Sequence, residues 1–157
     1  MPDYALLKTV HILSSTLLFG TGLGTAFHGW MANRSGVLAA RRVVNRNVER
    51  ADWLFTTPAV IAQPVTGIWL AQLAGFPLTT PWLVTAMALY VLVGACWLPV
   101  VAIQIAMRRI ADTTPDGADL PPRYHRLARW WFALGWPAFA GVIVIFWLMV
   151  AKPEFAL

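Results

Sequence analysis

The sequence predicts an all-α, polytopic membrane protein built as a bundle of four transmembrane helices. Three observations support this fold class. Of the 157 residues, 59% are hydrophobic and only 12% are charged, which is outside the usual range for a soluble domain. The apolar residues come in four runs of about 20, the length needed to cross a hydrocarbon core of about 30 Å. The basic residues are confined to two segments beside the ends of these runs, and only helices satisfy their own backbone polar groups in lipid.

These runs place four helices and two basic links within a single transmembrane domain, residues 1–157. Charge, proline, glycine or tryptophan bounds each run, and tryptophan favours the headgroup level. One basic link, at about 32–53, follows the first helix, and the other, at about 108–129, follows the third. The helices are expected at about residues 4–31, 54–73, 82–107 and 130–150.

The two basic links predict the orientation of the bundle. They carry ten of the twelve Lys and Arg residues, whereas the link 74–81 between helices two and three has no charge. By the positive-inside rule, the basic links face the cytoplasm and both termini lie outside. This clustering accounts for the net charge of +5, so we expect the lipid bilayer as a partner and no nucleic acid. The ten residues are Arg34, Arg41, Arg42, Arg46, Arg50, Arg108, Arg109, Arg123, Arg126 and Arg129.

The first basic link has helical propensity and an apolar stripe between its arginines. This pattern is typical of an amphipathic helix on the inner membrane surface, and it equally fits an extension of a neighbouring helix. The second basic link contains Pro115, Asp116 and Gly117, which indicate an ordered turn. At the entry of helix two, Asp52 is expected to act as a structural clamp by pairing with Arg50 or with an arginine of the second basic link.

His11 is the first candidate for a functional residue, because an ionisable side chain inside a membrane helix is costly and usually faces protein or a cavity. Lys8, His11 and Ser15 share one helix face, so they are expected to line one pocket on the outer side. A neutral imidazole there can bind haem iron, bind copper or relay a proton. The alternative is a histidine that is hydrogen-bonded to a neighbouring helix only for packing.

A second iron ligand is less obvious, since helices two to four contain no further histidine in their expected ranges. His28 is 17 residues beyond His11, about 25 Å along the axis and on roughly the opposite face, so the two cannot share a metal. His125 lies in the second basic link. Met87 enters helix three from the outer end and is the candidate thioether ligand, although most buried methionines only fill space. Without Met87 the iron would be five-coordinate, an arrangement that suits a catalytic haem better than one that only transfers electrons.

Two further features inside the helices predict helix packing. Gly20 and Gly24 have the GxxxG spacing that lets a neighbouring backbone approach closely. No strand precedes them and no lysine follows, so the glycine run is a packing surface and not a nucleotide loop. Gln63 and Gln104 are buried amides that are expected to bond across helices.

In the order of these segments, the chain resembles a family of predicted bacterial integral membrane proteins of unknown function. Its members share an Ala-Asp-x-x-Phe-Thr-x-Pro-Ala segment, present here at 51–59. Further matching pieces extend the resemblance over nearly the whole chain, at residues 7–12, 64–67, 97–101 and 120–124. A multi-pass protein of the bacterial inner membrane is therefore expected.

More distantly, the plan is similar to HemJ-type protoporphyrinogen oxidases, which are four-helix haem proteins. They carry Lys-x-x-His in helix one, Thr-Pro-Ala in helix two and a closing Lys-Pro, matched here at 8–11, 57–59 and 152–153. The resemblance implies a haem b site at His11. That family also has a functional lysine shortly after a tryptophan at the start of helix three, and the segment 82–86 has none. This departure counts against a shared reaction.

Three functions remain open on the sequence. The leading one is an inner-membrane protein that binds b-type haem through His11, for electron transfer or porphyrin-related redox chemistry, as a HemJ-like oxidoreductase if it is an enzyme. In this haem-binding function, Lys8 tunes the redox potential of the haem or holds one of its propionates. The second is a non-catalytic accessory or assembly subunit whose GxxxG face binds another membrane protein, or a homodimer. The third is a small metal-handling transporter in which His11, Met87 and Cys96 offer soft ligands.

Overall fold

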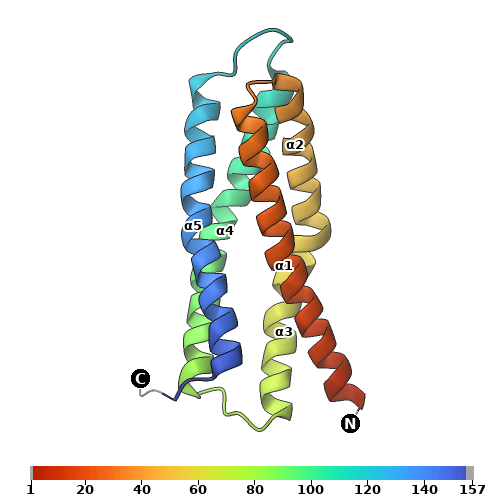
Figure 1. Cartoon of the computed structure of the whole chain (residues 1–157), viewed down its shortest axis with the longest axis vertical. Coiled ribbons are helices and arrows are strands. Elements are labelled where there is room, and N and C mark those ends of the chain that lie inside the picture. Colours follow the sequence, from red (N-terminus) through yellow and green to blue (C-terminus); the bar gives the residue numbers. More distant parts are fainter. Residues whose placement is uncertain (1, 155–157) are drawn as a thin grey trace.

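The computed structural model describes residues 2–154, and in this range the chain forms helices and turns without a strand (Figure 1). Four rods are long and apolar enough to cross a membrane. The predicted all-α, four-helix membrane fold is therefore confirmed. The elements are α1 (Pro2–Arg34), α2 (Leu38–Ala51), η1 (Asp52–Thr56), α3 (Thr57–Leu73), α4 (Pro81–Thr113) and α5 (Pro122–Ala151).

The helices extend further at one end than the apolar runs indicated. α1 and α4 each contain 33 residues, which corresponds to about 50 Å at 1.5 Å per residue, more than a hydrocarbon core of about 30 Å. α5 begins at Pro122, because proline at the first helical position needs no backbone N–H partner. Much of both basic links is consequently helical, and His125 lies on the first turn of α5.

α2 extends the second transmembrane helix, which is one of the two alternatives for the first basic link. It passes through η1 into α3, so that Leu38–Leu73 forms one rod. η1 is a single π-helical turn in which the N–H of Thr57 bonds to the carbonyl of Asp52, five residues back. Pro58 lies two residues after the end of this turn and cannot donate the backbone hydrogen bond that a regular α-helix would use there.

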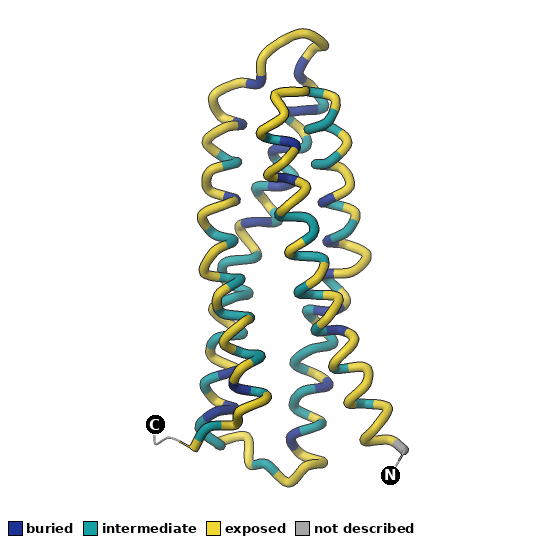
Figure 2. The backbone as a smooth tube through the Cα atoms, viewed as in Figure 1, coloured by how far each residue is buried: buried dark blue, intermediate teal, exposed yellow. Residues whose placement is uncertain are grey.

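The rods pack mainly as two antiparallel pairs, α4 with α5 and α1 with the α2–η1–α3 rod. Both described ends of the chain lie at one end of the bundle, which we call the terminal end (Figure 1). The opposite end, where α1 turns into α2 and α4 into α5, carries the arginines and is called the arginine end. Few residues along the rods are buried, and exposed and half-buried residues alternate along them (Figure 2), as expected where lipid is the solvent.

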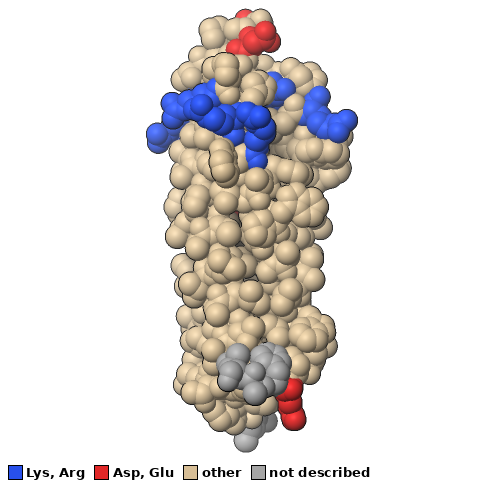
Figure 3. Space-filling view, turned by 90° about the vertical axis from the view of Figure 1, so that its left-hand side faces the viewer, with Lys and Arg blue, Asp and Glu red and all other residues tan. Residues whose placement is uncertain are grey.

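The face shown in Figure 3 has a band of Lys and Arg near one end and a wide uncharged belt beside it. Ion pairs within the band join α2 to α4 and the following loop: Arg42 to Asp116 at 2.6 Å and Arg46 to Asp112 at 2.9 Å. Arg108 bonds to Glu49 and also to Asp112. The expected clamp between Asp52 and an arginine is not among the ion pairs of residues 2–154, because this carboxylate is buried inside the bundle.

Tyr124 is the hub of the arginine end, and its side chain is 0% exposed. Its hydroxyl donates to Asn33 Oδ1 at 3.0 Å and accepts from Asn45 Nδ2 at 3.1 Å. These two bonds tie α5 to α1 and α2. Around the ring, Met107 and Trp131 belong to the same buried cluster. The arginine end therefore has a packed core of its own.

Glycine contacts do not follow the GxxxG prediction. A Cβ placed on Gly20 or Gly24 would meet no described atom within 4 Å, so this face is not a packing surface within residues 2–154. The close approaches occur elsewhere: a Cβ on Gly29 would lie 2.8 Å from the Trp131 ring and one on Gly67 would lie 3.2 Å from the His11 ring. Small residues permit a close helix approach, but the crossing points of the rods decide where it happens.

Candidate functional site

His11 lies where α1 crosses α3, and its ring is hydrogen-bonded to the buried Thr66. His11 Nδ1 lies 2.7 Å from Thr66 Oγ1, and the Thr66 hydroxyl donates to the carbonyl of Ala62 at 2.6 Å. A hydroxyl has one hydrogen, so His11 Nδ1 must be the donor in its bond to Thr66. In a neutral imidazole this fixes the proton on Nδ1 and leaves the lone pair on Nε2.

A second set of bonds fixes the backbone of α1 at the same place. Gln63 Nε2 donates to the His11 carbonyl at 2.7 Å and to Ser14 Oγ at 2.6 Å. Ser14 Oγ donates to the same carbonyl at 3.0 Å. The expectation that Gln63 bonds across helices is therefore confirmed. These contacts hold the position of His11 along α3 as well as the orientation of its ring.

Gly67 allows the imidazole to lie against the backbone of α3. A Cβ at this position would come within 3.2 Å of His11 Cε1 and 4.0 Å of Nε2. No described residue forms a hydrogen bond with Nε2. One nitrogen of the ring is therefore anchored by the protein, while the other is free of protein partners within residues 2–154. Histidines that bind metals commonly have one ring nitrogen anchored in this way.

The other predicted site residues do not join this cluster. Ser15 donates to the carbonyl of Ile12 on its own helix at 2.7 Å. Lys8 is exposed on α1, one turn from His11 toward the terminal end. Met87 lies on α4, whose main partner is α5, and its side chain is 40% exposed. The parts assigned to Lys8 and Met87 in ligand binding stay predictions.

Sequence reasoning did not select Ser14, Thr66 and Gly67 as site residues. Ser14 has the same three-residue spacing from His11 as Lys8, but lies toward the arginine end. Thr66 and Gly67 end the segment 64–67, which in the sequence indicated only the family resemblance. Gln63 and Thr66 are three residues apart and hence share a helix face. A search for polar pairs at this spacing would have found the α3 half of the site.

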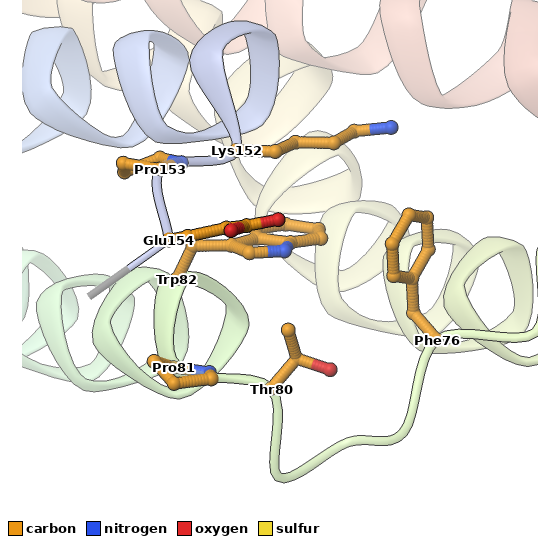
Figure 4. A pocket seen from close by; sticks show the side chains of 7 residues that line it. All are labelled: Phe76, Thr80, Pro81, Trp82, Lys152, Pro153 and Glu154. Atoms are coloured by element: carbon orange, nitrogen blue, oxygen red, sulfur yellow. The ribbon is translucent and has the colours of Figure 1, made fainter. Parts of the chain in front are cut away.

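A second polar feature lies at the terminal end, where the chain leaves α5. Lys152 Nζ lies 4.8 Å from the centre of the Phe76 ring and 6.0 Å from that of Trp82. These side chains and Glu154 line a pocket of about 560 Å³ (Figure 4). Lys152 adopts a left-handed backbone conformation with φ of 44° as it ends the helix. The closing Lys-Pro therefore covers an aromatic edge of the bundle.

Four apolar rods, an uncharged belt and a basic band at one end define a multi-pass integral membrane protein. The chain belongs to the family described as predicted integral membrane protein (DUF2269), whose sequence profile matches residues 5–153. Neither the curated proteins nor the solved structures that were compared with the chain gave a match. The expected membership of a family of predicted membrane proteins is thus confirmed, while the HemJ similarity rests on the motifs alone.

Proposed function

We propose that the protein binds a b-type haem through His11 Nε2 in the bacterial inner membrane, for electron transfer or porphyrin-related redox chemistry. The observation that carries this proposal is the asymmetry of the His11 ring. Nδ1 donates to a buried threonine that already has its own acceptor, and Nε2 has no partner among the described residues. Metal-binding histidines commonly have this arrangement, in which the second nitrogen is anchored by the protein.

The donor set fits a haem better than a bare metal ion. Within residues 2–154, no group of three or more His, Cys, Asp or Glu lies close enough to hold a metal. A porphyrin brings four nitrogen ligands, so a single imidazole is a sufficient protein ligand for its iron. Met87 stays the thioether that the sequence offers as a further ligand, but it lies on α4 and outside the His11 cluster.

The residues around His11 would have distinct tasks when haem is bound. The cofactor would supply one-electron chemistry, while the protein sets its orientation and electrostatics. Thr66 would hold the imidazole plane, and Gly67 would leave the room that a side chain would occupy beside the ring. Lys8, one turn toward the terminal end, would tune the potential or hold a propionate by its positive charge.

The absorption spectrum of the protein, purified from haem-sufficient cells, tests the proposal. We expect a Soret band in the oxidised and reduced wild type that is lost in His11→Ala. The matched control is His28→Ala, because His28 is exposed on the same helix and bonds to the Gly24 carbonyl of its own helix at 2.9 Å. A colourless wild type, or an unchanged band in His11→Ala, would refute haem binding at this site.

Thr66→Val keeps the shape of the side chain but removes the acceptor for His11 Nδ1. We expect about 10- to 100-fold weaker haem binding, which is typical when a partner that orients a metal ligand is lost. Haem titration of the apoprotein measures this change. Thr16→Val is the matched control, since the Thr16 hydroxyl bonds only to the Ile12 carbonyl of its own helix, at 2.9 Å. Equal affinity of Thr66→Val and wild type would contradict the proposed role of Thr66.

A second candidate function is an accessory subunit or a homodimer. The observation that favours it is the open space around Gly20 and Gly24, where the backbone of another helix can approach. This function predicts a protein without a chromophore that tolerates substitution of His11. Crosslinking from a cysteine placed at Gly20 would report a partner on this face.

A further inference from the structure

Asp52 is a buried carboxylate inside a transmembrane rod. Its residue exposure is 6%, and Oδ1 accepts a hydrogen bond from Thr56 Oγ1 at 2.8 Å. The other oxygen, Oδ2, is buried and has no hydrogen-bond partner among the described residues. Gln104 of α4 lies beside the same carboxylate. Of the four ion pairs that the described residues form, none includes Asp52.

The π-helical turn η1 places this carboxylate. Asp52 is the first residue of η1, and the turn packs against α1, α2 and α3. The wider turn rotates the residues before Pro58 relative to a regular helix, so that Asp52 and Thr56 are both buried. π-helical turns inside α-helices are frequent at functional sites. The local irregularity and the buried acid therefore belong to one feature.

An ionised carboxylate in this position would be costly. A buried charge without a partner carries a large desolvation penalty, and such a group usually takes up a proton instead. A metal cation would need several oxygen ligands, whereas the oxygens identified around Asp52 are those of Thr56 and Gln104. Gln104 suits either protonation state, because its amide can donate to a carboxylate or accept from a carboxylic acid.

We propose that Asp52 is an intramembrane proton-binding site, which holds a proton on Oδ2 at neutral pH and releases it when the surrounding turn is solvated. Uptake forms the O–H bond on Oδ2 with a proton from water, and release leaves the carboxylate, stabilised by the Thr56 hydroxyl. The inference is independent of haem. It assigns to this protein a second chemistry, the reversible binding of a proton within the bundle.

A cavity reaches the same turn from the neighbouring helices. It has a volume of about 390 Å³ between α1 and α2, and its lining includes Ala51 and Phe55, which lie in the same turns as Asp52. Polar side chains on its wall include Asn47 and His28. Such groups can hold water, which would bring protons to the turn.

No charged group on the packed elements forms an ion pair with Asp52 among the described residues. On α2 the charged residues nearest in sequence are Arg50, which is exposed, and Glu49, which bonds to Arg108 of α4. On α1, His28 lies on the wall of this cavity, and its Nδ1 is bonded to the Gly24 carbonyl. α3 contains no titratable residue. The proton on Asp52 would thus be governed by burial, Thr56 and Gln104.

Infrared spectroscopy of the protein in phosphatidylcholine nanodiscs tests the proposal. At neutral pH we expect one carboxylic acid C=O band, which shifts on labelling aspartate with ¹³C at the carboxyl carbon and disappears at alkaline pH. Asp52→Asn should remove the band, whereas Asp119→Asn, at an exposed loop position, should leave it. In Thr56→Val the band should move to higher frequency, because the carbonyl oxygen Oδ1 loses its donor.

Two results would overturn the proposal. One is the absence of an acid band in the labelled wild type at neutral pH, which would mean that Asp52 is ionised. The other is a band that persists in Asp52→Asn, which would assign the proton to another carboxyl group. If Asp52→Asn fails to fold, the labelled wild type and Thr56→Val still decide the question. Sodium-dependent thermal stability without an acid band would assign the site to a cation instead.

Discussion

Tyr124→Ala is expected to destabilise the protein by about 3–5 kcal/mol, the usual cost of removing a large aromatic side chain from a packed core. The ring is fully buried, and its hydroxyl joins Asn33 on α1 to Asn45 on α2. Arg123 and Arg126 flank Tyr124 at the arginine end of the bundle. Because these charged residues lie outside the hydrocarbon core, energies measured in the cores of soluble proteins apply to Tyr124. Thermal unfolding in detergent micelles, followed by far-UV circular dichroism, measures the loss.

Tyr124→Phe separates the contribution of the buried ring from that of the hydroxyl hydrogen bonds. It keeps the ring and leaves the two asparagine side chains without their shared partner, which should cost about 1–3 kcal/mol. Tyr4→Phe is the matched control, because Tyr4 is exposed near the terminal end and its loss of a hydroxyl should change little. Unfolding of Tyr124→Ala at the wild-type temperature would contradict the assignment of Tyr124 as the hub of the arginine end.

Gly29→Leu is expected to destabilise the bundle by up to about 3 kcal/mol through overpacking. Its Cβ alone would lie 2.8 Å from Trp131 Cη2, and the indole is only 9% exposed, so the ring has little room to move. The substitution would push α5 away from α1 near the Tyr124 cluster. The midpoint of an SDS unfolding titration reports the change.

Gly24→Leu, five residues earlier on α1, should change the stability of the bundle in the opposite direction. Nothing lies within 4 Å of its Cβ position. The substitution should therefore gain roughly 0.5–1 kcal/mol, since leucine is a better helix former than glycine. If both substitutions shift the midpoint equally, the contact between Gly29 and Trp131 does not bear on stability.

Much of the fold could be predicted from the sequence, and the errors have physical reasons. Hydrophobic run length located the four rods, because it reports the lipid-contacting part of a helix. It underestimated their ends, since Arg108 and Arg123 stop an apolar run without stopping a helix. The prediction for Gly20 and Gly24 was wrong within the chain because spacing does not determine where two rods cross.

The candidate site was predictable only in part. His11 was found from the cost of an ionisable group in lipid. Its partner Thr66 is 55 residues away on another helix, and no local pattern links the two. For Asp52 the expected arginine clamp was wrong, because a local sequence pattern does not reveal that η1 turns the carboxylate into the bundle.

The sequence by itself determined that this chain is a four-helix membrane protein with a basic end and an ionisable residue in its first helix. These properties depend on composition and on the length of the apolar runs, because apolar residues partition into lipid and charged residues stay in water. Only the tertiary structure decided which nitrogen of His11 has no partner among residues 2–154, which glycines are close contacts, and that Asp52 forms no ion pair in the same range. Those properties depend on the register between helices, and register is set by packing contacts between residues far apart along the chain.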